Sequence, residues 1–225
     1  MELKEIPFEA KDSGVYGSSC KYSIDDLPSD LPESYIALLA TYNGGNTYDD
    51  FFHFFGLVGP TQHNVIEWNR DELWKDFYHL DCTWFVFVED IFGRQYFFKR
   101  GGRKNAIYML APDDGKTYFM ADYFEIFLKD IIADSDAMYS EEKALADAFF
   151  AIPGNKKKYL HHLSYKTPII LGGCQGDITN LDQCDSLVNL SILGQLVRGL
   201  ENVEPGTVVK DVEIDYVNKK IRLIF

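Results

Sequence analysis

The side chains most able to do chemistry in this 225-residue chain are its cysteines and histidines. A reactive cysteine needs a setting that depresses its pKa, and none of Cys20, Cys82, Cys174 and Cys184 sits in a local basic setting of that kind. Of the four, Cys174 is the best candidate for a reactive cysteine, because it follows a predicted strand and two glycines. The cysteines form neither a CxxC pair nor a dense framework, so we expect reduced, buried and inert thiols.

The histidines and the carboxylates do not have the spacing of a metal site. No histidine pair occurs at i, i+4 beside a glutamate, and the adjacent His161 and His162 point in different directions on any regular element. Asp134-Ser135-Asp136 resembles the start of a calcium loop, but Tyr139 and Leu145 stand where that loop needs glycine and glutamate. The sequence predicts no metal and no cofactor. The histidines are His53, His63, His79, His161 and His162.

A glycine-rich run, Gly172-Gly173-Cys174-Gln175-Gly176, follows a predicted strand. Its spacing differs from both the Walker loop and the dinucleotide fingerprint, and Asp177 places negative charge where a phosphate would lie. The glycines are expected to let the backbone turn or approach a neighbour closely. Paired carboxylates are adjacent in sequence, which splays them apart and does not set up a general acid and base. The chain is therefore not expected to be an enzyme.

Composition and charge limit the classes of partner. A 46% hydrophobic content supports a sizeable core, and a formal net charge of -13 opposes binding to nucleic acid or anionic lipid. No run of about eighteen apolar residues is long enough to cross a membrane, and the N-terminal MELKEIPFEAKD is too charged for a secretory signal. We therefore expect a cytoplasmic protein with a basic partner.

The hydrophobic pattern predicts alternating helices and strands. Leu31, Tyr35, Leu38, Leu39 and Tyr42 recur at helical spacing, and Asn43-Gly44-Gly45 ends that helix with residues that accept positive φ. Further helices are expected at 62–78, 119–131, 145–152 and 185–200. Strands are expected at 47–57, 83–89, 94–99, 106–110 and 167–171, followed by a terminal hairpin around 218–219.

Two stretches resemble known families. LPESYIALLATYNGG, FVEDIFGRQYFF and ADYFEIFLKDI, over roughly 25–132, resemble the SUKH superfamily, which includes fungal cell-wall synthesis regulators and many bacterial immunity proteins. FGRQYFF and YKTPIILGGCQGDITNLDQCDSLVNLSILGQL, within roughly 84–200, resemble the C-terminal domain of type VI secretion immunity proteins. Residues 1–24 match neither pattern.

The predicted fold is α+β, with a central, mostly antiparallel, SUKH-like sheet flanked by helices. Residues 1–135 form the core, and residues 136–225 form a C-terminal helix and hairpin extension packed on it or continuous with it. The resemblance implies an immunity protein that binds a toxin domain and occludes its active site, and the acidic charge of the chain favours a basic toxin such as a nuclease. The alternative is an intracellular scaffold or regulatory module. Exposed acidic pairs at turns are the partner-binding candidates: Asp49, Asp50, Glu89, Asp90, Asp113 and Asp114.

Overall fold

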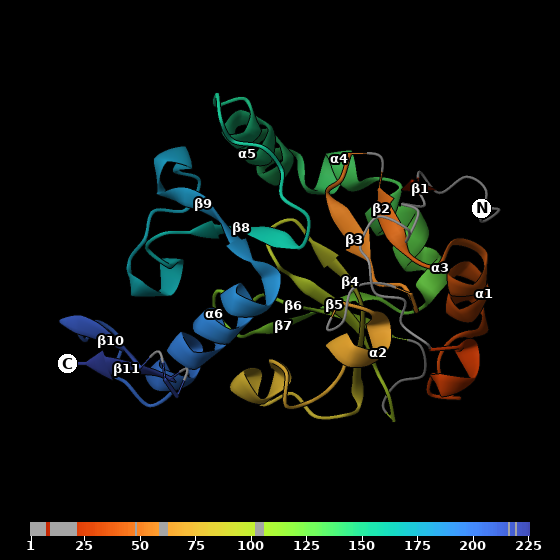
Figure 1. Ribbon diagram of the computed structural model, residues 1–225, viewed down its shortest axis with the longest axis horizontal. Helices are drawn as coiled ribbons and strands as arrows, with labels where there is room; N and C mark the ends of the chain where they lie inside the picture. The colour runs from red at the N-terminus through yellow and green to blue at the C-terminus, as the bar shows by residue number, and fades with distance from the viewer. Residues whose placement is uncertain are drawn as a thin grey trace.

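A seven-stranded antiparallel sheet in the order β1-β2-β3-β4-β5-β6-β7 forms the centre of the computed structural model. The structure describes residues 8–9, 22–47, 49–58, 63–101, 106–215, 217–218 and 220–225. In Figure 1, α1 and α3 lie to the right of the central strands, and α6 lies to the left with the terminal hairpin. The predicted α+β architecture with an antiparallel sheet is confirmed.

The central sheet contains β1 (Phe8–Glu9), β2 (Gly45–Thr47), β3 (Phe52–Phe54), β4 (Trp84–Asp90), β5 (Gln95–Lys99), β6 (Ile107–Leu110) and β7 (Thr117–Ala121). Two ribbons of two strands each are formed by β8 (His161–Tyr165) with β9 (Leu181–Asp185), and by β10 (Asp211–Asp215) with β11 (Lys220–Ile224). The α-helices are α1 (Glu33–Tyr42), α2 (Val65–Trp68), α3 (Phe124–Ile126), α4 (Ser135–Met138), α5 (Ser140–Phe150) and α6 (Ser186–Leu200). Short 3-10 helices are η3 (Ile24–Asp26), η4 (Lys75–Tyr78), η6 (Ile169–Leu171) and η7 (Ile178–Asn180), and η5 (Phe127–Ile132) is a π-helix.

The junction between α1 and the sheet shows why this chain needs asparagine followed by glycine. Asn43 takes a left-handed conformation with φ 50°, and its Oδ1 accepts hydrogen bonds from the backbone amides of Leu57 and Val58 at 2.9 and 3.1 Å. A Cβ on Gly44, whose φ is +79°, would lie 2.5 Å from the carbonyl oxygen of Phe54. The junction lets a helix enter a strand in little space.

Aromatic side chains join α1 and α3 to one face of the sheet. The ring of Tyr35 lies 5.4 to 5.6 Å from those of Phe87, Phe98 and Phe124, measured between centroids. Phe87 and Phe98 stack across β4 and β5 at 4.3 Å. Such tilted and offset pairs add to the free energy gained from burial, and they hold the two central strands rigidly beneath the helices.

Four predicted elements differ from the structure. The strand expected at 47–57 is two strands, β2 and β3, which pair antiparallel with each other. The helix expected at 62–78 is two short helices, α2 and η4, because the Asn69 side chain turns away and bonds the backbone of Val86 on β4 through both of its polar atoms. The strand expected at 167–171 is the 3-10 helix η6, because Pro168 precedes it and Gly172 closes it with φ 90°. Residues 119–121 of the helix predicted at 119–131 belong to β7 instead.

The C-terminal part packs on the core through β8, α5 and α6. Phe149, Leu163, Leu190 and Leu193 belong to the same buried cluster as the aromatic residues of the sheet. The backbone amide of Leu163 on β8 donates to the carbonyl of Ile91, in the turn between β4 and β5, at 2.7 Å. The terminal hairpin was predicted, and it contacts α6, but the ribbon formed by β8 and β9 was not predicted.

Candidate functional site

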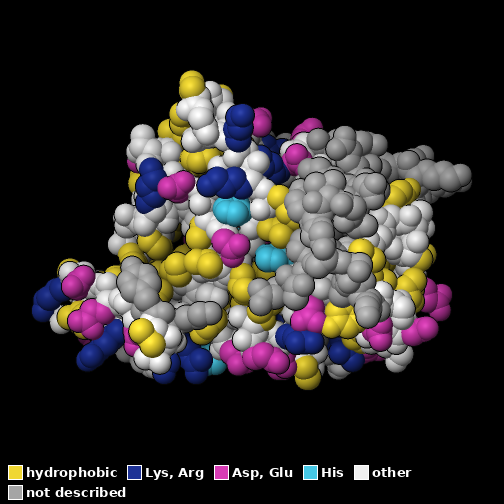
Figure 2. All heavy atoms as spheres, viewed as in Figure 1, with side chains coloured by type: hydrophobic (Ala, Val, Ile, Leu, Met, Phe, Trp, Pro, Cys, Tyr) yellow, Lys and Arg dark blue, Asp and Glu magenta, His cyan; other side chains and the backbone are white. Residues whose placement is uncertain are grey.

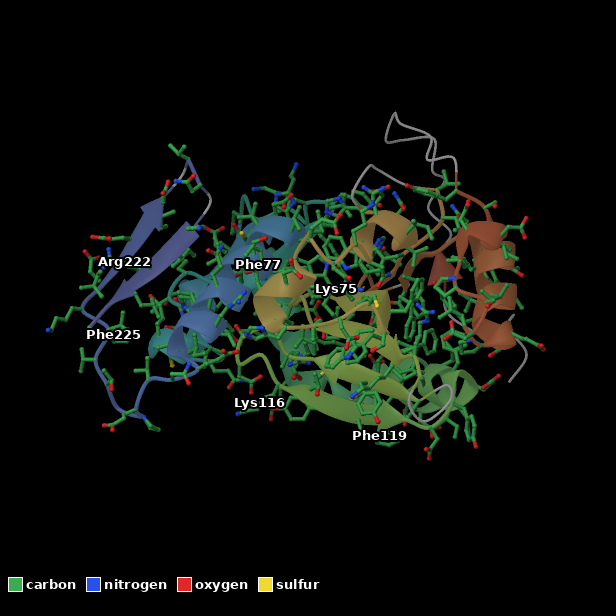
Figure 3. All side chains as sticks on the ribbon, turned by 90° about the horizontal axis from the view of Figure 1, so that it is seen from below. Lys75, Phe77, Lys116, Phe119, Arg222 and Phe225 are labelled. Carbon is green, nitrogen blue, oxygen red and sulfur yellow. The ribbon has the colours of Figure 1, made fainter. Side chains whose placement is uncertain are left out.

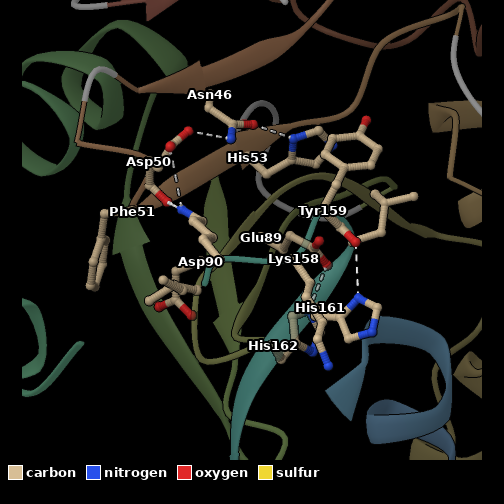
Figure 4. A pocket seen from close by; sticks show the side chains of 13 residues that line it. Asn46, Asp50, Phe51, His53, Glu89, Asp90, Lys158, Tyr159, His161 and His162 are labelled. Atoms are coloured by element: carbon tan, nitrogen blue, oxygen red, sulfur yellow. Dashed lines mark hydrogen bonds and ion pairs between the residues drawn. The ribbon is translucent and has the colours of Figure 1, made fainter. Parts of the chain in front are cut away.

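A cavity of about 220 Å³ lies where β3, β4 and β8 meet. Its lining includes His53 from β3, Glu89 and Asp90 from the end of β4, and His161 and His162 from β8. Figure 2 shows histidine, acidic and basic side chains gathered near the centre of this face, and Figure 4 shows the cavity from close by. The cavity brings together more titratable groups than the sequence predicted for any one place.

The floor of the cavity is a buried carboxylate that bonds a buried imidazole. His162 is 1% exposed and Glu89 is 4% exposed, and Nε2 of His162 lies 3.0 Å from Oε2 of Glu89. The same carboxylate oxygen accepts a hydrogen bond from Nε2 of Gln95 at 3.0 Å. Buried charges persist in proteins only when they are paired and hydrogen-bonded, and this carboxylate meets both conditions.

Both members of the Glu89–His162 pair are connected by hydrogen bonds to further side chains. The indole of Trp68 donates to Oε1 of Gln95 at 2.8 Å, and the amide of Asn189 on α6 lies 3.1 Å from Nδ1 of His162. The hydroxyl of Ser164 donates to Oδ1 of Asn189 at 2.7 Å. One hydrogen-bonded chain therefore crosses the boundary between the sheet and the C-terminal part, which holds β8 and α6 in register with β4.

A second chain of polar contacts forms the opposite wall. Nδ1 of His53, which faces Glu89 in the pairing of β3 with β4, lies 2.7 Å from Oδ1 of Asn46. The amide nitrogen of Asn46 donates to Oδ1 of Asp50 at 2.6 Å. Asp50 also pairs with Lys157, whose Nζ lies 3.9 Å from its Oδ2. These contacts set the orientation of the His53 ring at the mouth of the cavity.

The two carboxylates at the end of β4 have opposite pKa shifts. Burial raises the pKa of Glu89, but the charge and the hydrogen bond of His162, together with His53 and Gln95, outweigh burial, so the pKa lies below its ordinary value. Burial raises the pKa of Asp90 above its ordinary value because Arg94 and the backbone amides offset desolvation incompletely. Glu89 is therefore the ionised group at the cavity floor.

Neither a metal centre nor a cysteine site emerges from this geometry. Within the described ranges, no group of three or more histidine, cysteine, aspartate or glutamate side chains could hold a metal ion. The expectation of buried cysteines is wrong for Cys82 and Cys174, which are exposed on loops, and Cys184 is partly exposed. Cys20 lies outside the described residues. A Cβ on Gly173 would lie 1.8 Å from the carbonyl oxygen of Thr167, so this glycine allows a close approach of two backbone segments.

The central sheet and its first helices match a family of known proteins. The model of the SMI1/KNR4 family (SUKH-1) matches residues 25–130, which span α1 to η5. Residues 25–130 belong to the SMI1/KNR4 family (SUKH-1). The cavity lies at the edge of this SUKH-1 domain, because Glu89 belongs to the domain whereas His162 and Lys157 come from the part that follows it.

A solved structure shares the fold beyond the SUKH-1 domain. It is described as "Crystal structure of Atu4351 from Agrobacterium tumefaciens", and it aligns with a TM-score of 0.52 and 15% sequence identity. The alignment covers 89% of this chain and 88% of that chain, which is more than residues 25–130 alone supply, so the likeness in fold extends into the C-terminal part. No match was found among curated protein sequences. No described helix is long and apolar enough to span a membrane.

The predicted acidic pairs lie in three different settings. Asp49 and Asp50 follow β2, where Asp49 pairs with Lys143 on α5 at 2.5 Å. Asp113 and Asp114 lie in the turn between β6 and β7, and Asp114 contacts Lys116 at 3.4 Å. The premise of exposure is wrong for the third pair, Glu89 and Asp90, which are 4% and 2% exposed, because β4 is a central strand and β8 covers its end. Asp50, Glu89 and Asp90 line the same cavity.

The edge strand β7 and the start of α3 expose aromatic side chains, of which Phe119 and Tyr123 were predicted to lie on a helix. Tyr118 and Phe119 on β7 are 44% and 52% exposed, and Tyr123 at the start of α3 is 53% exposed. In the part of the chain that the structure describes, β7 pairs with β6 alone. Figure 3 places Lys116 and Phe119 along one border of the molecule and Arg222 and Phe225 on the terminal hairpin.

Proposed function

We propose that the chain is an immunity protein that binds a basic toxin domain and blocks its active site or substrate groove. Its SUKH-1 domain supports this proposal, because the superfamily that it resembled in sequence includes many immunity proteins. The net charge of -13 supports a basic partner and disfavours nucleic acid and anionic membranes. The proposal places the protein in the cytoplasm, where it transforms no substrate.

The observation that carries the proposal is the exposed aromatic edge formed by Tyr118, Phe119 and Tyr123. Aromatic side chains are enriched at the centres of protein interfaces and contribute much of their binding energy. A strand with one unpaired edge also offers backbone donors and acceptors to an extended segment of a partner. Asp114 beside this edge pairs with Lys116, so the acidic charge that suits a basic partner comes from Glu125 on α3 and from the net charge of the chain.

Co-expression with the toxin gene found beside this gene tests the proposal. Growth should be restored, and the two proteins should co-purify as a complex. Replacing Phe119 and Tyr123 by serine should weaken the complex by about a hundredfold, because two exposed aromatic anchors are lost. Replacing Val217, which is 90% exposed on the terminal hairpin, by serine is the matched control and should leave affinity unchanged. Unrelieved toxicity with no complex would refute the proposal.

No specific observation favours the alternative of an intracellular scaffold or regulatory module. The second resemblance, to the C-terminal domain of type VI secretion immunity proteins, stays a prediction, since the family match ends at residue 130. A purified complex with a housekeeping protein, formed at the aromatic edge in the absence of any toxin, would support the scaffold instead.

A further inference from the structure

One oxygen of the buried Glu89 carboxylate is left for a ligand. Oε2 accepts both hydrogen bonds, from His162 and Gln95, whereas Oε1 has no hydrogen-bond donor among the described residues. Oε1 is not fully buried. Because Glu89 lines the cavity, this oxygen is open to the cavity. In Figure 4 the dashed line leaves one carboxylate oxygen toward His162, and the other oxygen points into the space near His53 and Tyr159.

The charge at the cavity floor selects the sign of the ligand. Glu89 is ionised and lies in surroundings that screen charge poorly, where a carboxylate interacts strongly with a nearby cation. An anion would face that carboxylate at short range. His162 contacts Oε2 and offsets part of this charge, whereas Oε1 faces the cavity. On the opposite wall the charge of Lys157 is offset by Asp50, so Lys158 is the exposed cation at the rim. The floor outweighs the rim because solvent screens the exposed ammonium.

The size and the walls of the cavity select an organic cation. A volume of about 220 Å³ is smaller than the ~300–1,000 Å³ of pockets that hold drug-sized ligands, and it suits one side-chain-sized group. Tyr159 lines it, and aromatic rings attract ammonium and guanidinium groups. A metal ion fits less well, because the described residues include no cluster of three or more suitable ligands.

We propose that this cavity binds the ammonium or guanidinium group of a lysine or arginine side chain of the partner, with Oε1 of Glu89 as the acceptor. The source of the cation rests on the proposed function, whereas the site itself does not. The aromatic edge on β7 and this cavity are then two separate contacts, one that supplies apolar area and one that recognises a single basic side chain.

Binding of small cations to the full chain tests the site directly. Methylguanidinium and n-butylammonium are titrated separately while the imidazole signals of His53, His161 and His162 are followed by NMR. Saturable shifts of the His53 and His162 signals are expected with at least one cation, while acetate and inorganic phosphate, at matched ionic strength, leave them unchanged. Saturable shifts with the anions alone, or no saturable shift with either cation, would overturn the proposal.

Two substitutions locate the binding. Glu89→Gln should weaken cation binding about tenfold or more, because a hydrogen bond to a charged group is lost. Glu213→Gln, at an exposed position on β10, is the matched control and should have no effect. Glu89→Gln removes charge from the core, so Lys158→Glu provides a test on the surface: it should tighten cation binding about threefold. Weaker cation binding in Lys158→Glu, or unchanged binding in a folded Glu89→Gln, would overturn the proposal.

The toxin complex separates failure of the site from failure of the proposed function. If the cations bind and no toxin forms a complex, the site stands and the immunity function fails. If a toxin binds with unchanged affinity after Glu89→Gln, the immunity function stands and the proposed occupant of the site is refuted. If both are correct, Glu89→Gln weakens the toxin complex, and n-butylammonium or methylguanidinium competes with the toxin.

Discussion

Nε2 of His162 lies 3.0 Å from Oε2 of Glu89, and this contact joins residues that are 73 positions apart. Both side chains are almost fully buried, and each has a further partner on its own side, Gln95 for the carboxylate and Asn189 for the imidazole. Because hydrogen bonds depend on distance and angle, the pair fixes the position of β8 relative to β4. It also forms the floor of the cavity proposed to bind a cation.

Removal of His162 should destabilise the fold strongly. His162→Ala leaves the Glu89 carboxylate buried without its main partner, and the free energy of unfolding should fall by about 3–5 kcal/mol. His161→Ala is the matched control, since His161 is the adjacent strand residue, is partly exposed and bonds only the Tyr159 carbonyl through Nδ1. Urea denaturation of both variants measures the difference. Equal losses of unfolding free energy in the two variants would show that the buried Glu89–His162 pair adds nothing to stability beyond what a partly exposed histidine adds.

Gly93 is required both for its backbone and for the space that it leaves to His162. Its φ is +85°, and a Cβ there would lie 2.5 Å from Nδ1 of the His162 ring. Gly206 has φ +88° with no atom within 4 Å of such a Cβ, so it isolates the backbone effect. Gly206→Ala should cost about 1–2 kcal/mol, whereas Gly93→Ala should cost about 3 kcal/mol or more, measured by thermal and urea unfolding. Similar costs would contradict the predicted crowding.

The Asn43 side chain should matter beyond its left-handed backbone. Asn43→Gly keeps that conformation and loses the hydrogen bonds to the amides of Leu57 and Val58, which should cost about 2 kcal/mol. Asn43→Ala loses the same bonds and adds the strain of positive φ, so it should cost about 1 kcal/mol more. Urea denaturation compares the two variants. A glycine variant as stable as the original protein would show that only the left-handed backbone conformation is needed at this position.

Asp113 should make stability depend on pH in the mildly acidic range. Burial, together with the charges of Asp114 and Asp90, raises its pKa to about 6 against the opposing charge of Arg94. The folded state therefore binds this proton more tightly than the unfolded state, and the stabilisation is complete below about pH 4 and is lost as the pH rises through 6. At pH 7, Asp113→Asn should raise the free energy of unfolding by about 2 kcal/mol, because it removes an ionised carboxylate that is only partly exposed to solvent. At pH 4 the carboxyl is protonated, so the same substitution should have little effect.

Urea titrations at pH 4 and pH 7 check this prediction. Asp147→Asn, at an exposed aspartate on α5, is the control and should change stability little at either pH. An equal effect of Asp113→Asn at both pH values would contradict the linkage to a buried proton.

Local patterns sufficed to predict part of the SUKH-1 domain. The period of apolar residues from 31 to 42 corresponds to α1, and the strands expected at 83–89, 94–99 and 106–110 correspond to β4, β5 and β6. The turn chemistry of Asn43-Gly44-Gly45 and the start of α6 near residue 185 are likewise confirmed. These features depend on residues within a few positions of one another, so the sequence records them directly.

Such local patterns could not predict the candidate cavity. Glu89 and Asp90 belong to a paired-carboxylate motif that is typical of exposed turns, and nothing near them in sequence indicates that β8 will cover them. His162 has neither metal-site spacing nor an evident partner in the sequence, and its partner is identified only when β8 docks on the end of β4. Burial and pairing over 73 positions depend on how the C-terminal part packs, which local periodicity does not encode.

By itself the amino-acid sequence determined the composition of a buried aromatic core, an acidic surface and the order of most helices and strands, because these follow from side-chain type and short-range spacing. Only the tertiary structure decided which carboxylates are exposed, that the aromatic residues of β7 face solvent, and that one oxygen of Glu89 opens into a cavity. Each of these depends on desolvation by segments distant in sequence, and desolvation is a property of the packed chain.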